Sequence, residues 1–181
     1  MSKIACIPAI LSLALSACAV GPPPQLTPVG DVIPAGVSLE GRWKLRDGAA
    51  EAERRIRRAE YRSAGGRSGA DGPSVYVFLR TGDRLKITQT PYALFVSFDR
   101  SVVEEYRFRE HRLVSVGPIE ADRASGWMNG KYVIQTLDNE GALLEETYAP
   151  EAGGDVLART ISVVYDDEEI LSLRQVYDRI D

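Results

Sequence analysis

The sequence predicts a mainly β domain built as an antiparallel meander, with one Arg-rich helix inserted after the first strand. Three observations carry this prediction. From Val75 onward, apolar and polar residues alternate in short runs, which is the pattern of half-buried strands. Turn residues separate these runs at short intervals, and Asn129-Gly130 is the strongest hairpin signal among them. Helices do not alternate with the strands, which argues against a parallel βαβ arrangement.

The first strand is expected over residues 39–46, where Leu39, Trp43 and Leu45 share one face and charged residues occupy the other. Further strands are expected over residues 75–80, 84–89, 92–98, 102–108, 112–116, 123–128, 131–137, 142–148, 156–165 and 170–177. A meander this long usually closes into an up-and-down barrel, because open sheet edges invite aggregation. Closure would pair residues 39–46 with residues 170–178, and a two-sheet sandwich is the alternative.

The helix is expected over residues 49–62, where the apolar period changes to three and four. Its thin apolar stripe consists of Ala49, Ala52, Ile56 and Ala59. Asp47 is the expected N-cap. On the polar side, Arg54, Arg58 and Arg62 form a ridge that could meet lipid phosphates. Glutamates dilute this ridge, so a solvated, salt-bridged surface is the favoured interpretation.

The N-terminal segment predicts export. Lys3 precedes an apolar run over residues 4–15. This run is too short to span a bilayer, which takes about 20 residues, but is typical of a secretory signal. Leu-Ser-Ala-Cys follows at residues 15–18 and resembles the lipobox of bacterial lipoproteins. The resemblance implies a signal peptide over residues 1–17 and acylation of Cys18, by palmitate or a similar chain. Ala19, in place of an aspartate, favours the outer membrane, with the domain facing the periplasm.

Residues 18–38 carry five prolines between Pro22 and Pro34. Proline favours extended polyproline II and removes backbone donors, so we expect this segment to stay unfolded and to act as a lipidated tether. The antiparallel β domain is then expected over residues 39–181.

Composition argues against several kinds of site. The formal net charge of −4 does not suit nucleic-acid binding. Only Cys18 remains after removal of the signal peptide, so no disulfide or Cys-based metal site is expected. His111, the single histidine, lies in a charged turn without a nucleophile elbow. The acidic turn at residues 166–169 lacks the ligand spacing of a calcium loop. We therefore expect no enzyme activity, no cofactor and no metal.

Gly41-Arg42-Trp43 resembles the G-x-W element on the first strand of lipocalins. In that family the tryptophan plugs the closed end of the barrel, and an arginine from the last strand packs across it. Arg174 and Arg179 are the two candidates here, and strand alternation leaves the choice between them open.

The lipocalin resemblance implies a binding module that holds a small apolar or amphipathic ligand inside the barrel. Candidate wall residues are Phe78, Tyr92, Leu94, Phe98 and Tyr132. The chain is also similar to a loosely defined group of bacterial envelope proteins without known activity. The shared elements are the early G-x-W, Trp127 to Gly130, Glu146-Thr147-Tyr148 and Tyr177-Asp178-Arg179.

Two classes of function therefore remain. The first is a non-catalytic carrier or sensor, which requires a cavity within the barrel. The alternative is an envelope interaction protein that meets another protein or an anionic membrane surface through its arginine ridge, its acidic turns or a sheet edge.

Overall fold

The computed structural model describes residues 24–65 and 72–180. Ten strands in this part of the chain form one antiparallel sheet, in the order β4-β3-β2-β1-β10-β9-β8-β7-β6-β5. The strands are β1 (Gly41–Leu45), β2 (Arg84–Gln89), β3 (Ala93–Phe98), β4 (Val102–Arg107), β5 (Glu110–Val116), β6 (Ile119–Met128), β7 (Lys131–Asp138), β8 (Leu143–Glu151), β9 (Val156–Tyr165) and β10 (Glu168–Ile180). The helices are α1 (Ala49–Ser63) and the short 3-10 helices η1 (Val75–Phe78) and η2 (Ala152–Gly154). The predicted antiparallel meander is confirmed.

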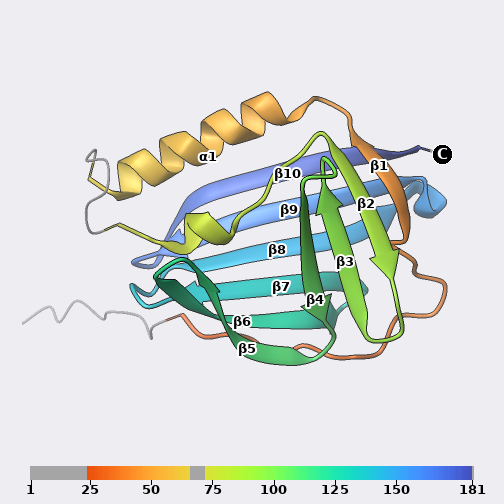
Figure 1. The fold of residues 1–181 in the computed structure, drawn as a ribbon, viewed down its shortest axis with the longest axis horizontal. Coiled ribbons are helices and arrows are strands. Elements are labelled where there is room, and N and C mark those ends of the chain that lie inside the picture. The colour runs from red at the N-terminus through yellow and green to blue at the C-terminus, as the bar shows by residue number, and fades with distance from the viewer. Residues whose placement is uncertain (1–23, 66–71, 181) are drawn as a thin grey trace, which may run out of the picture.

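The sheet curves into a nearly closed, lipocalin-like barrel. In Figure 1, β5 to β10 run side by side, and β1 to β4 cross them at a steep angle. β1 joins the two halves by pairing with both β2 and β10. The predicted contact between the first and last strands is confirmed, in a register that places Arg42 opposite Ile180 and Leu45 opposite Tyr177. The two end strands of the sheet are β4 and β5, which follow each other in the chain.

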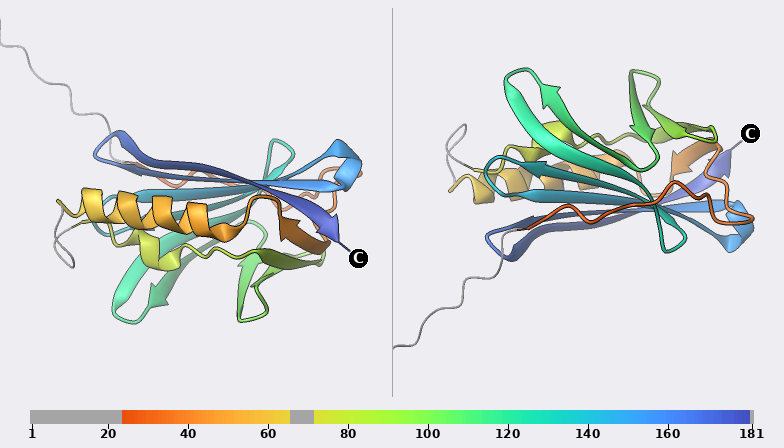
Figure 2. Two further views of the ribbon diagram at one scale, coloured as in Figure 1. Left: turned by 90° about the horizontal axis from the view of Figure 1, so that it is seen from above. Right: turned by 90° about the horizontal axis from the view of Figure 1, so that it is seen from below.

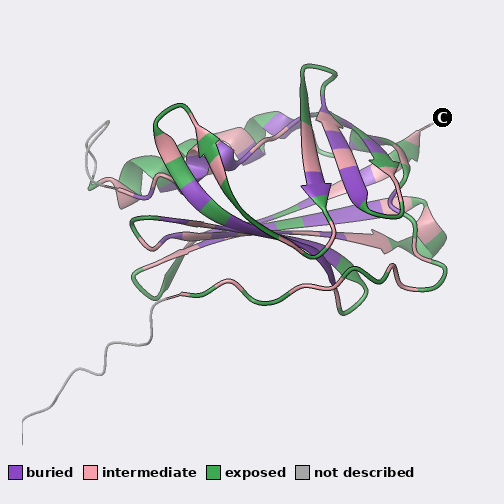
Figure 3. Cartoon of the chain, turned by 60° about the horizontal axis from the view of Figure 1, so that its bottom comes forward, coloured by how far each residue is buried: buried purple, intermediate pink, exposed green. Residues whose placement is uncertain are grey.

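Side chains that point inward form two apolar clusters. The first, the tryptophan cluster, contains Leu39, Trp43, Leu45, Ala49, Leu85, Ile87, Leu94, Val96, Phe98, Tyr106, Trp127, Tyr132, Ile134, Tyr148, Leu157 and Tyr177. The second, the helix cluster, contains Ala52, Ala59, Val75, Tyr76, Phe78, Leu79, Ala121, Ala142, Leu144, Ile161, Val163, Leu171 and Leu173. Buried and exposed positions alternate along β2 and β10, as a half-solvated antiparallel sheet requires, whereas β7 and the second half of β6 are buried at nearly every position. Figure 3 shows both kinds of strand.

Helix α1 forms as predicted and lies along β10 over one end of the barrel, with η1 beside it (Figures 1 and 2). Ala49, Ala52 and Ala59 are buried on its inner face. The expected N-cap is wrong. Gly48 occupies the N-cap position. The backbone N–H of Ala49, which has no partner within the helix, donates to Oδ1 of Asp83, a residue outside the helix, at 2.6 Å.

The prediction of a strand over residues 75–80 is also wrong, because residues 75–78 form the 3-10 helix η1. Val75, Tyr76 and Phe78 are all buried there, so the segment does not alternate between a wet and a dry face. Asp138 on β7 holds the turn, since its Oδ2 accepts the backbone N–H groups of Ser74 and Val75 at 2.8 Å each.

Residues 27–37 lie against the outer face of the barrel rather than free of it. Gly30 pairs with Trp127 through two backbone hydrogen bonds of 2.9 Å, and the N–H of Thr27 donates to Gln135 Oε1 at 2.7 Å. Gly126 permits this approach, because a Cβ there would overlap the carbonyl of Gly30. Ile33 also packs against the tryptophan cluster. Our expectation that this stretch stays unfolded is therefore wrong from Thr27 onward. The right view of Figure 2 shows its course.

Candidate functional site: the barrel interior and its opening

One end of the barrel is sealed by Trp43 and Arg179. Trp43 is fully buried and donates its indole N–H to the carbonyl of Leu39 at 3.1 Å. The guanidinium of Arg179 lies 4.2 Å from the centre of the Trp43 ring, and its Nη1 donates to the carbonyl of Glu40. Gly41 has φ of 145°, and a Cβ there would overlap this guanidinium. The glycine of the G-x-W element thus makes room for an arginine stacked on its tryptophan.

The structure decides between the two candidate arginines and corrects one proposed wall residue. Arg174 points outward and forms an ion pair with Glu151 at 2.8 Å, so Arg179 is the arginine that covers Trp43. Tyr92 is 78% exposed, because it lies in the turn before β3 and the strand alternation does not extend to it. The other four proposed wall residues are buried, with Leu94, Phe98 and Tyr132 in the tryptophan cluster and Phe78 in the helix cluster.

A polar layer crosses the interior between the two apolar clusters, with Arg159 on β9 at its centre. Arg159 is fully buried and forms an ion pair with Glu146, which is 1% exposed. Its other guanidinium contacts are Gln175 Oε1 at 3.1 Å and the carbonyl of Arg80 at 2.7 Å. Burial alone would lower the pKa of this guanidinium. The neighbouring Tyr148, Glu146 and Tyr177 outweigh burial, so the pKa is raised and the group stays charged.

Two atoms of this layer have no hydrogen-bond partner among the described residues: the hydroxyl of Tyr148 and the side-chain nitrogen of Gln175. Both belong to residues at most 4% exposed. A buried polar group without a partner costs about 1–3 kcal/mol. The layer therefore offers two donors to a water molecule or to an acceptor atom of a ligand.

The barrel opens between β4 and β5. Near the turn that joins them, side chains of β7 and β6 hold the end of β4. The hydroxyl of Tyr132 donates to the carbonyl of Tyr106 at 2.9 Å, and that of Ser125 donates to the carbonyl of Arg107 at 2.7 Å. Farther from the turn the two strands separate without pairing. We call the region between these two unpaired strands the gap.

A pocket of about 420 Å³ occupies this gap. Its lining consists of Phe78, Arg80, Glu104, Arg112, Leu113, Val114, Ser115, Val116 and Arg123. Arg123 lies at the inner end, 5% exposed, between the rings of Phe78 and Tyr106 at 5.6 and 5.5 Å. The carboxylate of Glu104 forms ion pairs with both Arg80 and Arg123, at 3.4 and 3.9 Å. Arg112, the third guanidinium of the lining, pairs with Glu110 outside the pocket at 3.5 Å, so Arg80 and Arg123 share the single carboxylate of Glu104. The remaining positive charge makes the pocket suitable for an anionic group attached to an apolar body.

Sequence reasoning missed Arg123 and Arg159, although a signal for both exists. Arg159 is in phase with the inward residues Leu157 and Ile161, and Arg123 is in phase with Ala121 and Trp127. A charged residue at an apolar position of a strand is an interior polar group whenever that face is buried.

Other features of the described residues offer little chemistry. His111 faces Asp122 at 3.8 Å, with both side chains more than half exposed. On α1, Arg54 pairs with Glu51 and Arg57 with Glu53, in agreement with a salt-bridged surface. The described residues contain no group of three or more candidate metal ligands. Across residues 24–65 and 72–180, no helix combines the length and apolarity needed to cross a membrane.

Comparison with solved structures identifies proteins of similar fold. Apo lipid binding protein 8 of Caenorhabditis elegans superposes with a TM-score of 0.51 at 14% identity, over 80% of this chain and 99% of that one. Fatty-acid-binding protein 1 of Echinococcus granulosus gives 0.49 at 12% identity, over 79% and 98%. Secretory abundant heat soluble protein 4 of Ramazzottius varieornatus gives 0.49 at 16%, over 78% and 94%. No protein-family model and no curated protein matches the sequence. The likeness to lipid binding protein 8 shows a shared fold.

Proposed function

We propose that this protein is a non-catalytic binding module that takes a small amphipathic ligand into its barrel through the gap between β4 and β5. The observation that carries the proposal is the pocket in that gap, which connects the solvent with the buried guanidinium of Arg123. The C. elegans protein of similar fold is a lipid binding protein by name, which agrees with this proposal.

The ligand we propose has an acidic head and an apolar tail. Arg80 and Arg123 share the one carboxylate of Glu104, whereas Arg112 pairs with Glu110, so the pocket keeps an excess positive charge that favours an anion. Phe78, Val114 and Val116 supply apolar surface beside these guanidinium groups. The carrier hypothesis drawn from the sequence required a cavity within the barrel, but tyrosine and arginine side chains fill much of the interior. The proposed site is therefore the pocket at the gap, and a tail would enter farther only by rearranging residues where β4 and β5 are not paired.

A fluorescent fatty acid, dansyl-aminoundecanoic acid, tests the proposal on the full chain. We expect saturable binding with a blue-shifted emission, and weaker binding of the methyl ester by about tenfold, because a hydrogen bond to a charged group contributes about 1.5–3 kcal/mol. Val114→Trp, which fills the pocket, should weaken binding at least tenfold. Val103→Trp is the matched control, since Val103 lies on β4 but points outward and is 65% exposed. Absence of saturable binding, or equal binding by both variants, would refute the proposal.

We also propose that Cys18 carries the lipid that anchors the protein at the outer membrane, facing the periplasm. The lipobox at residues 15–18 supports this. Because the chain contacts the barrel from Thr27 onward, any tether is shorter than residues 18–38 would allow. Labelling with radioactive palmitate should be lost in Cys18→Ala, and Ala19→Asp should move the protein to the inner membrane of an enteric host. Unchanged labelling of Cys18→Ala would contradict the assignment.

A further inference from the structure

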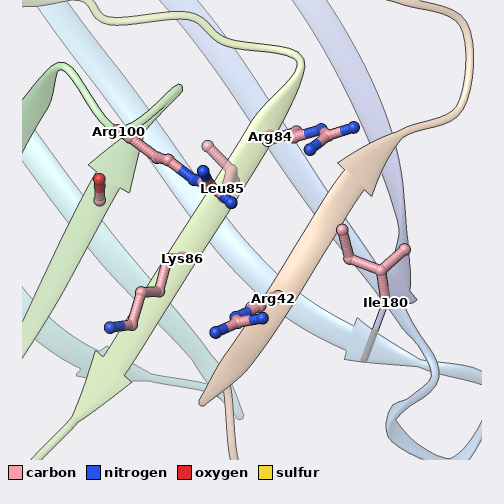
Figure 4. A pocket seen from close by; sticks show the side chains of 7 residues that line it. Arg42, Arg84, Leu85, Lys86, Arg100 and Ile180 are labelled. Atoms are coloured by element: carbon pink, nitrogen blue, oxygen red, sulfur yellow. The ribbon is translucent and has the colours of Figure 1, made fainter.

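The outer face of β1 and β2 gathers cationic side chains in a chain that is acidic overall. Arg42 and Lys44 on β1 point outward, as do Arg84 and Lys86 on β2, while Trp43 and Leu85 between them are buried. Arg100 reaches the same surface from the turn after β3. Figure 4 shows its side chain directed toward Leu85, with Arg42 and Lys86 on the neighbouring strands. The formal net charge of the chain is −4, so this surface is not a consequence of composition.

The strand register sets like charges directly against each other. Arg42 lies opposite Lys86, and Lys44 lies opposite Arg84. Directly opposed like charges destabilise an antiparallel pair. The uncharged Ile180 and Ser97 flank the first of these pairs on β10 and β3, so that row contains no carboxylate, whereas Asp178 lies opposite Lys44 in the second row.

Nearby carboxylates are engaged elsewhere. Asp178 on β10 pairs with Arg46 at 2.5 Å, and Asp99 accepts the backbone N–H groups of Asp83 and Arg84. Within residues 24–65 and 72–180, no ion pair involves Arg42, Arg84, Lys86 or Arg100. The charges on this face are therefore available to an external anion.

These four residues, with Leu85, Ser97 and Ile180, line a pocket of about 350 Å³. We propose that this pocket, which we call the basic pocket, binds a phosphate-bearing anion. Guanidinium groups match phosphate oxygens in bidentate geometry, and Lys86 adds a point charge. The basic pocket lies on the outside of the sheet, whereas the gap between β4 and β5 leads inward. The two sites are therefore separate, and this inference does not depend on the proposed function.

Pyrophosphate binding to the full chain in neutral detergent tests the inference by calorimetry at low and physiological salt. We expect saturable binding that weakens with salt. Arg42→Gln combined with Lys86→Gln should weaken it at least tenfold. Arg54→Gln combined with Arg58→Gln on α1 is the control, because it removes the same charge from another surface. No binding by the wild type, or equal weakening in both double variants, would overturn the proposal.

A second measurement distinguishes a soluble phosphate from a lipid head group. Mass spectrometry follows the rate at which a reagent acetylates the Lys86 amine of the full chain under three conditions. The chain is bound to phosphatidylcholine vesicles, to the same vesicles with pyrophosphate added, or to vesicles that also contain phosphatidylglycerol. Protection by pyrophosphate on phosphatidylcholine vesicles would support a soluble ligand. Protection by phosphatidylglycerol alone would support a lipid head group. Equal reactivity under all conditions would overturn the basic pocket as a phosphate site.

Discussion

Replacing Arg159 by methionine tests whether the polar layer holds the barrel interior together. The substitution keeps much of the volume but removes the guanidinium from Glu146, Gln175 and the carbonyl of Arg80. Glu146, 1% exposed, would be left as a buried carboxylate without its cation. Breaking a buried ion pair from one side costs about 3–5 kcal/mol. With a urea m-value of about 2 kcal/mol/M, the unfolding midpoint should fall by about 2 M.

The double variant Arg159→Met/Glu146→Met separates an unpaired charge from lost packing. Apolar replacement of both partners of a buried pair is often neutral or stabilising. Here the carbonyl of Arg80 stays without its donor, so we expect the double variant to be about 1 kcal/mol less stable than the wild type. Urea unfolding of the full chain, followed by tryptophan fluorescence, measures both. A single variant that costs under about 1 kcal/mol, or a double variant as unstable as the single one, would refute this reasoning.

Four further outcomes follow from the same contacts. Gly41→Ala should cost about 2–3 kcal/mol, because it adds backbone strain and displaces the arginine stacked on the tryptophan, whereas Gly130→Ala, with open space around it, should cost about 1 kcal/mol in thermal or urea unfolding. Tyr132→Phe should lose about 1 kcal/mol with its hydrogen bonds, while Tyr148→Phe, whose hydroxyl has no partner, should lose nothing. Lys86→Gln should raise the free energy of unfolding by about 0.2–1 kcal/mol, since it removes a like-charge pair, and an unchanged or lowered value would contradict this. Burial raises the pKa of Tyr132 and Tyr148 above the unfolded value near 10, so the free energy of unfolding should be unaffected by their ionisation below that pH and should fall as the pH rises above it. Absorbance at 295 nm should then rise together with unfolding rather than before it.

The local sequence pattern was sufficient to predict an element where a segment had one solvent-exposed face and one buried face. The apolar stripe of α1 and the alternation of β9 both appeared at the predicted residues. The same kind of pattern gave a wrong prediction for residues 75–78, where apolar content suggested a strand. Burial on all sides and the carboxylate of Asp138, 63 residues away in sequence, instead allow a helical turn.

The tether shows a similar limit. Proline content correctly indicates an extended chain without regular structure, but it does not indicate what that chain touches. Gly126 within β6 is the sequence signal that a backbone approaches closely at this point. Only the folded sheet shows that the approaching backbone is that of Gly30.

By itself, the sequence determined the antiparallel meander, the inserted helix and the inward direction of Trp43, because side-chain alternation and turn chemistry are local properties. Tertiary structure decided which arginine covers that tryptophan, where the barrel remains open, and that Arg123 and Arg159 lie inside it. Those outcomes depend on strand register and on pairing between residues far apart in the chain. The energy of such contacts is set by three-dimensional neighbours, which no short window of sequence contains.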